Sequence, residues 1–405
     1  MTDNNENKVL NVPHLRFPEF SGEWEIYPLT DFMSFKNGMN PDAKRFGRGT
    51  KFISVMDILN NQFICYDNIR ASVEVVDGDI ETYGVNYGDI LFQRSSETLE
   101  DVGQANVYLD SKPAVFGGFV IRGKSKSNYY PMFFRYLLAS PTARKKIIVK
   151  GAGAQHFNIG QDGLSKVCLN IPSIQEQEKI AKLFECIDTR IATQNKIIEK
   201  LQSLIKGLSQ QLLSSENDWI LYRLDDLAQI KSGYSGTQVS YQPPYKVSRI
   251  ETISKHCIDI QRIGYVECIP ESYRLNVGNI LFSNINSIQY IGNTAYLDKD
   301  YGLYHGMNLL RIIPNTTIVR PRFLHLLLCT DWAINHFQTI CNKAVSQASI
   351  NQTALGKSRF PIPPMSVQQQ ICSMFELTER KLDNEQEYIS CLQQQKRYLL
   401  QKMFI

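Results

Sequence analysis

The feature that most constrains this chain is an unbroken heptad pattern over residues 175–213. Its core-facing positions alternate in steps of four and three residues, as in a coiled-coil seam, and nine of the ten are apolar. They are Ile180, Phe184, Ile187, Ile191, Gln194, Ile198, Leu201, Ile205, Leu208 and Leu212. A helix of about 39 residues would be roughly 58 Å long. Because this is far longer than an ordinary globular helix, it needs a partner along its length.

The C-terminal stretch repeats this pattern 191 residues later. Its seam positions are Ile371, Phe375, Thr378, Leu382, Glu385, Ile389, Leu392, Lys396, Leu399 and Met403. Pro172 and Pro363 stand just before the two stretches, as a helix start allows. The second seam is more polar, so we interpret it as the antiparallel partner of the first rather than as a self-pairing helix. Two unrelated helices in separate cores are the alternative, but they would not share start, length and register.

The segments between the helices are also repeated. Matching pairs at shifts of 195 to 189 residues are Trp24 and Trp219, Lys36 and Lys231, Gly38 and Gly233, Gly88–Phe92 and Gly278–Phe282, and Arg122 and Arg311. We therefore expect an α+β protein with two similar mixed α/β modules, two long coiled-coil helices and a pseudo-twofold internal repeat. The predicted division is a disordered tail (1–13), a first module (14–173), a central long helix (174–213), a second module (214–364) and a C-terminal long helix (365–405).

Each module combines apolar β-type runs with a closing helix. The predicted strands are Lys51–Val55, Asp89–Gln93 and Ala114–Arg122 in the first module and Tyr245–Ile250, Asn279–Ser283 and Leu309–Ile313 in the second. The closing helices are predicted over 131–150 and 321–341. Each leads into a polar loop, residues 151–158 and 346–351, where side chains are free to meet a ligand.

Composition excludes several classes of protein. Hydrophobic residues make up 43% of the 405, typical of a folded chain, and no apolar run approaches the length of a membrane span. We therefore expect no membrane association and no secretory signal. The nine cysteines form no C-x-x-C pair, which predicts reduced thiols in the cytoplasm. Because the net charge is only +4, binding to nucleic acid would rely on local clusters and polar base contacts.

No pattern in the sequence argues for catalysis. One possible metal set, His325, Cys329 and His336, could share a helix face. The first module carries Arg135 and Lys146 at two of the matching positions, so the repeat gives no metal site. We expect no catalytic residue, no metal and no cofactor.

Three elements together resemble the specificity (S) subunit of type I restriction-modification systems. They are Gly88–Phe92, the loop ending at Asn158, and residues 171–181 (IPSIQEQEKIA) before a heptad helix. The resemblance covers residues 14–405 and implies two target recognition domains that each read one half of a split double-stranded DNA sequence. It also implies that the long helices act as a ruler and dock two methylation (M) subunits, and that restriction (R) subunits complete the complex. Such a chain serves DNA methylation and host defence without an active site of its own.

The second half departs from the family pattern. It has Val367, Gln368 and Gln369 where the family tends to Glu-Gln, and its seam contains polar residues. The pairing register of the helices is therefore left open. Two other classes also stay open: a coiled-coil scaffold that joins protein partners without binding DNA, and a specificity domain of a single-chain restriction and methylation enzyme, which the length and missing motifs oppose.

Candidate DNA-binding residues follow from placement in the family. Arg to guanine and Asn or Gln to adenine are the favoured base pairings, so the first candidates for base contact are Arg94, Asn158, Asn284 and Gln347. The candidates for phosphate contact are Lys44, Arg45, Arg48 and Arg249. Further residues expected near DNA are Lys36, Asn37, Ser95, Gln155, His156, Lys231, Ser283, Asn286 and Ser349. Each could instead serve a turn, a cap or a solvated surface.

Overall fold

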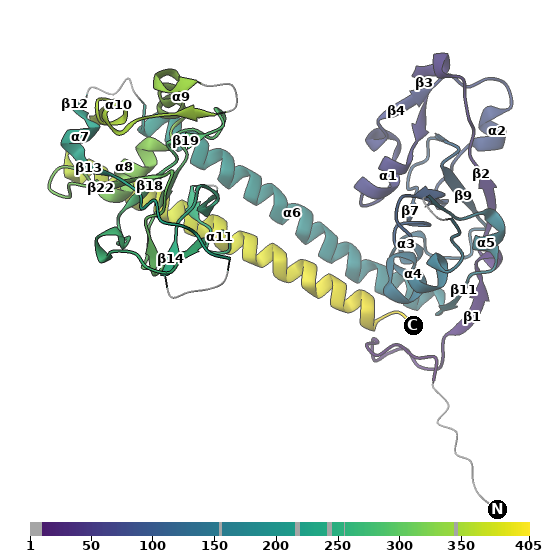
Figure 1. Cartoon of the computed structure of the whole chain (residues 1–405). Helices are drawn as coiled ribbons and strands as arrows, with labels where there is room; N and C mark the ends of the chain where they lie inside the picture. The colour runs from purple at the N-terminus through teal and green to yellow at the C-terminus, as the bar shows by residue number, and fades with distance from the viewer. Residues whose placement is uncertain (1–9, 154–155, 215–218, 241–244, 255, 344–346) are drawn as a thin grey trace, which may run out of the picture. The chain divides into compact units, whose positions relative to one another are not determined.

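The computed structural model describes residues 10–153, 156–214, 219–240, 245–254, 256–343 and 347–405. The chain divides into two compact units, residues 1–195 with 387–405 and residues 196–386. Each unit contains one of the repeated modules and part of each long helix (Figure 1).

The first unit is built on a four-stranded antiparallel sheet in the order β2-β9-β5-β7. Its strands are β2 (Met33–Asn37), β9 (Val120–Ser125), β5 (Ile90–Gln93) and β7 (Ala105–Val107). All four residues of β5 are buried, because the sheet has a core on each face. Ile90 and Phe92 face one core, and Leu91 faces the other. This alternation is what a two-residue side-chain period produces.

A smaller sheet, in the order β4-β3-β8, pairs β3 with β8 in parallel. Its strands are β4 (Ala71–Val73), β3 (Phe46–Ile53) and β8 (Val115–Phe116). The prediction of one strand over Ala114–Arg122 is wrong, since β8 and β9 belong to different sheets. The chain turns at Gly117, whose carbonyl accepts from the Val120 N–H at 2.9 Å. A Cβ at Gly117 would lie 2.7 Å from the Phe52 ring.

The second unit has the same strand orders, β13-β22-β18-β20 and β17-β14-β21. These strands are β13 (Ala228–Ser232), β22 (Leu310–Pro314), β18 (Ile280–Phe282), β20 (Thr294–Tyr296), β17 (Gly264–Val266), β14 (Tyr245–Val247) and β21 (Leu303–Tyr304). Again one pair, β14 and β21, is parallel. Ile280 and Phe282 face one core and Leu281 the other. The predicted internal duplication is confirmed at the level of sheet topology.

Each closing helix is in fact two helices, so the single helices predicted over 131–150 and 321–341 are wrong. The observed helices are α3 (Pro131–Ala139) and α4 (Pro141–Ile148), then α8 (Pro321–Leu328) and α9 (Asp331–Ile340). The break falls at a capping residue in both modules. Ser140 accepts from the Ala143 N–H, and Thr330 accepts from the Ala333 N–H.

A short two-stranded ladder precedes each long helix. β1 (Glu25–Pro28) pairs with β11 (Cys168–Ile171), and β12 (Ile220–Arg223) pairs with β25 (Arg359–Ile362). A buried glutamine then anchors each helix start. Gln177 accepts from the backbone N–H that precedes α3 (3.0 Å) and donates to the Pro172 carbonyl (3.0 Å). Gln368 makes the same bonds before α8 (2.8 Å) and to Pro363 (2.9 Å).

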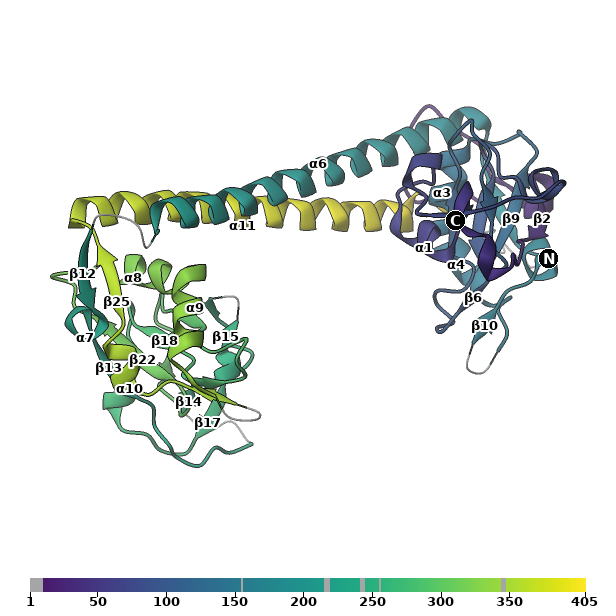
Figure 2. The same ribbon diagram turned by 90° about the horizontal axis from the view of Figure 1, so that it is seen from above.

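The long helices are α6 (Ile174–Leu212) and α11 (Met365–Lys402), and segments of the two lie side by side and antiparallel in each unit (Figures 1 and 2). In the first unit, Phe184 contacts Phe404 and Asp188 pairs with Lys396. In the second, Ile205 packs in one core with Phe375. All ten positions of each predicted heptad seam are buried or half-buried. None of the helices in the described part of the chain combines the length and apolarity that crossing a membrane requires.

Candidate nucleic-acid interface

In the first module a two-stranded ribbon joins the two loops that the sequence analysis selected. β6 (Ser95–Ser96) follows β5 directly and pairs with β10 (Phe157–Asn158), as Figure 2 shows. Ser95 lies opposite Asn158, and its hydroxyl donates to the Asn158 side-chain oxygen. Asn158 is held further by two backbone bonds to Ala152, both 2.9 Å. His156 is exposed beside it, while Gln155 lies outside the described residues.

The second module has a ribbon in the same place. β19 (Ile285–Asn286) pairs with β24 (Ala348–Ser349), which also pairs with β23 (Asn342–Lys343). The Ile350 N–H donates to the backbone carbonyl of Asn284 at 2.8 Å, which closes the foot of the ribbon. Gln347 is exposed just before β24. The structure therefore brings the predicted loops of this module together as well.

The candidate base-contact side chains differ in how far they are available. Asn158 and Gln347 are exposed, whereas Arg94 is half-buried and donates to the Gly118 carbonyl at 3.2 Å. The side-chain oxygen of Asn284 is buried and has no hydrogen-bond partner among the described residues. Ser283 is only 1% exposed and accepts from the Asn286 amide at 3.1 Å, so it positions Asn286 rather than facing solvent.

The candidate phosphate contacts already have partners in most cases. Arg45 forms an ion pair with Asp79, Arg48 with Glu74 at 2.6 Å, and Arg249 with Glu251 at 3.4 Å. A backbone N–H first, and Arg45 in addition, hold the Asp79 pKa below its ordinary value. Lys44 is exposed and forms no ion pair with any residue that the structure describes. A phosphate would have to compete with these carboxylates everywhere except at Lys44.

Sequence reasoning missed a pair of buried arginines as functional candidates. Arg122 stands directly opposite Lys36 in the β2–β9 ladder, and Arg311 stands opposite Lys231 in the β13–β22 ladder. Both arginines are about nine-tenths buried or more, at 6% and 5% exposure. A signal was present, because each is an arginine that directly follows apolar residues at matching places in the repeat.

The suspected metal set is not assembled as the sequence suggested. The Cys329 thiol lies 3.4 Å from His325 but 3.3 Å from His256, and His336 instead contacts the Ser358 hydroxyl at 3.0 Å. Burial raises the pKa of Cys329 to about 12 and lowers that of His325 well below its ordinary value, so both are neutral at pH 7. Among the described residues, no group of three or more His, Cys, Asp or Glu side chains is placed to hold a metal ion.

Two copies of one mixed α/β module, each with a polar ribbon and each tied to long helices, define an internally duplicated two-module protein. The model of the type I restriction modification DNA specificity domain matches residues 21–203 and 216–394. Because the two matches cover most of the chain, this protein belongs to that family. The family resemblance inferred from the sequence is confirmed.

Curated relatives carry the same description. The putative type I restriction enzyme MjaX specificity subunit of Methanocaldococcus jannaschii is 38% identical over 193 residues, which are 46% of this chain and 45% of that protein. The chain thus spans less than half the length of that relative. The MjaVIII specificity subunit of the same organism is 21% identical over 398 residues, 90% of this chain and 87% of that protein.

Solved structures share the fold over nearly the whole length. The type I restriction-modification S subunit from M. genitalium matches with a TM-score of 0.58 at 15% identity and covers 97% of this chain and 99% of its own. The HsdS subunit from Thermoanaerobacter tengcongensis matches with a TM-score of 0.52 at 12% identity, covering 94% and 96%. At these identities the likeness establishes the architecture alone.

Proposed function

We propose that this chain is the non-catalytic DNA-reading subunit of a type I restriction-modification complex. Its modules, residues 14–173 and 214–364, act as target recognition domains that each read one half of a bipartite double-stranded DNA sequence. The long helices dock two methylation subunits, and restriction subunits join the full complex. The complex works in the cytoplasm, where its DNA target is found.

The observation that carries this proposal is the pair of ribbons. They occupy the same place in the two modules and have matching register, yet their side chains differ. Ser95 and Asn158 face each other in the first, and Ile285 and Ser349 in the second. One scaffold with two different polar surfaces suits a protein that reads two unlike half-sites. A two-stranded ribbon also fits the major groove, where the donor and acceptor pattern of each base pair is unique.

Exposed apolar side chains on the long helices support protein docking. Leu204, Met374 and Leu377 in the second unit are 42–59% exposed. Tyr388 and Tyr398 in the first unit are 47% and 52% exposed. All five lie outside the seams that join α6 to α11, so pairing of the two helices leaves them available. Apolar side chains that remain uncovered on a long helix are typical of a protein interface.

The decisive experiment is to produce the chain with its methylation subunit and to map modified adenines across a host genome at single-base resolution. We expect an interrupted motif with two unlike half-sites at a fixed gap. N158A should relax or abolish one half-site and Q347A the other, since each removes an exposed amide from one ribbon. An assembled complex that binds its methyl donor yet modifies no new site would refute the proposal and favour a protein scaffold.

Salt separates the same two classes in a binding assay. Contacts to several phosphates release counterions, so DNA affinity should fall steeply as salt rises. Docking of protein partners through apolar helices should change little. K44A should weaken binding to all duplexes about equally, because a phosphate contact carries no sequence information.

A further inference from the structure

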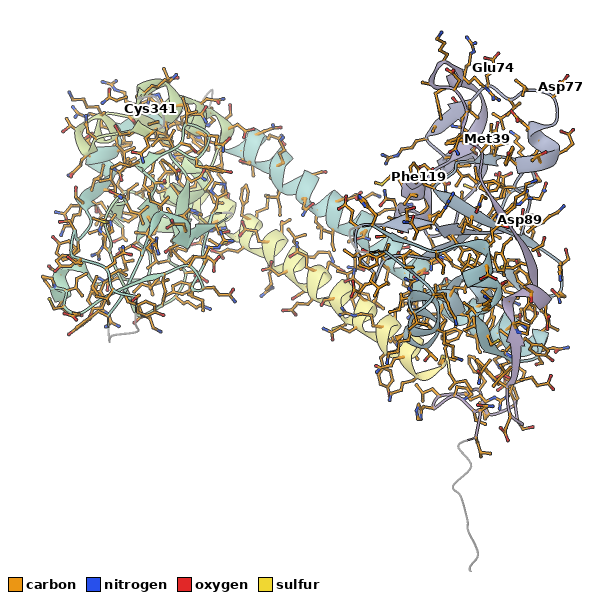
Figure 3. All side chains as sticks on the ribbon, turned by 45° about the vertical axis from the view of Figure 1, so that its right-hand side comes forward. Met39, Glu74, Asp77, Asp89, Phe119 and Cys341 are labelled. Carbon is orange, nitrogen blue, oxygen red and sulfur yellow. The ribbon has the colours of Figure 1, made fainter. Side chains whose placement is uncertain are left out.

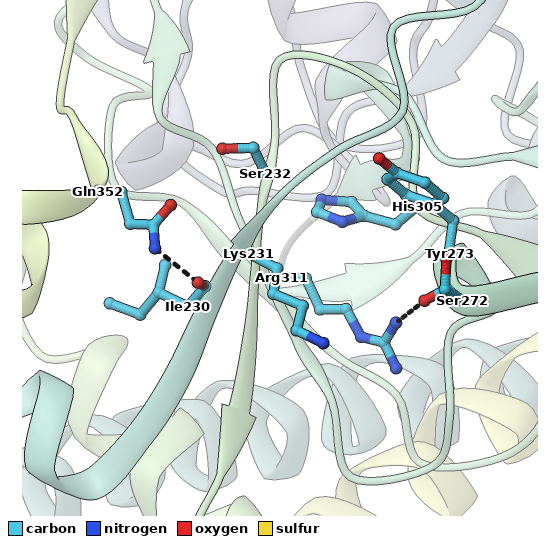
Figure 4. A pocket seen from close by; sticks show the side chains of 8 residues that line it. All are labelled: Ile230, Lys231, Ser232, Ser272, Tyr273, His305, Arg311 and Gln352. Atoms are coloured by element: carbon cyan, nitrogen blue, oxygen red, sulfur yellow. Dashed lines mark hydrogen bonds between the residues drawn. The ribbon is translucent and has the colours of Figure 1, made fainter. Parts of the chain in front are cut away.

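A pocket of about 430 Å³ opens beside β13 in the second module (Figure 4). The residues that matter for its chemistry are Lys231, Ser272, Tyr273, His305, Arg311 and Gln352. Of the residues that the structure describes, no Asp or Glu lines it. The described lining therefore presents an ammonium, a guanidinium and neutral polar groups, with no fixed negative charge to balance the two cations.

Two like charges stand directly opposite each other in this pocket. Lys231 and Arg311 are cross-strand partners in the antiparallel β13–β22 ladder, so their side chains project from the same face. Such a pair is destabilising in a sheet. The first module has the same arrangement, Lys36 opposite Arg122. Both modules therefore keep the like-charged pair, although their ribbons differ.

The modules differ in what offsets this charge. In the first module, the residue before β5 is Asp89 (Figure 3), which is 2% exposed. Burial lowers the pKa of Arg122, and the carboxylate of Asp89 opposes this shift. In the second, the matching residue is Asn279, which is neutral. Burial lowers the pKa of Arg311 with no carboxylate to oppose it. A buried guanidinium without a counter-ion is costly, and an anion from outside would relieve that cost.

The hydrogen bonds of Arg311 leave room for such an anion. Its Nε donates to Asn279 Oδ1 at 2.8 Å, and Nη1 donates to the Ser272 carbonyl at 3.3 Å. Neither acceptor carries a formal charge. His305 beside it is neutral at pH 7, because burial lowers its pKa to about 4, and it contacts the Leu309 carbonyl at 3.0 Å. The described lining of the pocket thus carries a net positive charge that no carboxylate of the lining neutralises.

The pocket lies at the foot of the ribbon. Gln352, three residues after Ser349 of β24, opens α10 (Gln352–Gly356) and donates to the Ile230 carbonyl of β13 at 2.7 Å. In the first module the side-chain amide of Gln161, three residues after Asn158, lies 2.9 Å from the Phe35 carbonyl of β2 and donates to it once the amide oxygen and nitrogen are exchanged. Any ligand held here would be fixed next to the side chains that vary between the modules.

We propose that the pocket of the second module binds a phosphate group, supplied by the backbone of the bound duplex. The identity of the source rests on the proposed function, whereas the affinity for the anion does not. Arg and Lys are the usual phosphate partners, through charge-assisted hydrogen bonds. A backbone contact positions the protein without reading sequence. This contact sets the register of the ribbon on the DNA.

Two substitutions test the anion site directly in the full chain. N279D copies the first module and places a carboxylate beside Arg311 with almost no change of shape, and K231M removes the exposed ammonium. Thermal unfolding is followed while inorganic phosphate replaces chloride at constant ionic strength. We expect phosphate to raise the Tm of the natural chain and of the control K246M, an exposed lysine on β14, more than that of N279D or K231M. Equal shifts in all four proteins would overturn the proposal.

A second arm identifies the source of the phosphate. The same variants, assembled with methylation subunits, are titrated with mixed-sequence duplex DNA at several salt concentrations. If the duplex supplies the phosphate, the slope of log affinity against log salt falls by about 1 in N279D and K231M. Phosphate-dependent stabilisation with an unchanged slope would overturn the duplex as the source and leave a free phosphate compound. Failure of every protein to bind DNA, with the phosphate effect intact, would refute the proposed function but not the anion site.

Discussion

The strongest test of the helix pairing is the ion pair between Asp188 of α6 and Lys396 of α11. Asp188 is 9% exposed, and its second carboxylate oxygen accepts from the Tyr136 hydroxyl at 2.9 Å. Lys396 keeps 26% of its side-chain exposure and lies over the Tyr136 ring at 5.6 Å. The two partners of the pair are therefore unequally buried, so their removal should have unequal effects.

K396M leaves a buried carboxylate without its cation. Breaking a fully buried pair costs about 3–5 kcal/mol. Tyr136 still holds one oxygen, and Arg135 also interacts electrostatically with Asp188, so we expect about 2 kcal/mol. D188N keeps the tyrosine bond and leaves a lysine that can reach water, so it should cost only about 1 kcal/mol. The double variant leaves no unpaired charge and should resemble D188N, which gives a coupling of about 2 kcal/mol.

Thermal unfolding measures these differences. In a unit of about this size, 1 kcal/mol corresponds to roughly 2–4 °C, so K396M should lower the Tm by about 4–8 °C and D188N by about 2–4 °C. The matched control is K381M on the same helix. Lys381 is 61% exposed and pairs with Glu385 at 3.2 Å, so its loss should cost less than about 0.5 kcal/mol. If K396M behaves like K381M, or if D188N is the more damaging change, the buried pair does not fix the register.

Three further outcomes follow from single residues. Q177A removes both anchoring bonds at the start of α6, so it should lower the free energy of unfolding by about 2–3 kcal/mol in a urea titration. The control Q369A, at an exposed position of α11, should lower it by less than about 0.5 kcal/mol. Equal effects would refute the role of Gln177 as an anchor. G117A should destabilise the first module by about 1–3 kcal/mol, since its Cβ would overlap the Phe52 ring, and a neutral result would show that the ring can move aside. His305 has a pKa of about 4 in the folded protein against 6.5 in the unfolded chain, so the unfolded chain binds a proton more readily between these values. The free energy of unfolding should therefore be unaffected by this residue above pH 6.5 and should fall by about 3 kcal/mol in total as pH drops toward 4. The H305F variant should lack this pH-dependent part, and parallel stability curves for the two proteins would contradict the assignment.

The fold was predictable where the signal extends over many residues. A seam of ten positions and a repeat with several matched motifs survive local substitution, so the helices and the duplication could be inferred. Local breaks were harder. Ser140 before Pro141 is a boundary signal, because a residue before proline disfavours the helical region, yet the apolar pattern runs across it. The turn at Gly117 depends on the Phe52 ring 65 positions away, which the sequence does not reveal.

The candidate site was predictable at the level of loops and not of side chains. The family resemblance selected the segments that form both ribbons. It could not show that Arg48 pairs with Glu74, or that Ser283 is buried beneath Asn286. Such contacts join residues through the folded backbone and leave no local pattern. The pocket around Arg311 was missed for the same reason, because its meaning depends on the strand opposite.

The duplication also explains which helix pairs with which. Positions 191 residues apart are equivalent, so Asp188 corresponds to Glu379, and Lys396 corresponds to Ile205. If two copies of α6 paired in the same register, Asp188 would face Ile205 and would be buried without a cation, at a cost of several kcal/mol. Paired with α11, it meets Lys396 instead. Glu379 pairs with Arg322 of its own module. After duplication, divergence at one seam position, Ile205 in α6 and Lys396 in α11, is therefore enough to favour the α6–α11 pair over an α6–α6 pair between chains, as a buried polar residue does in coiled coils generally.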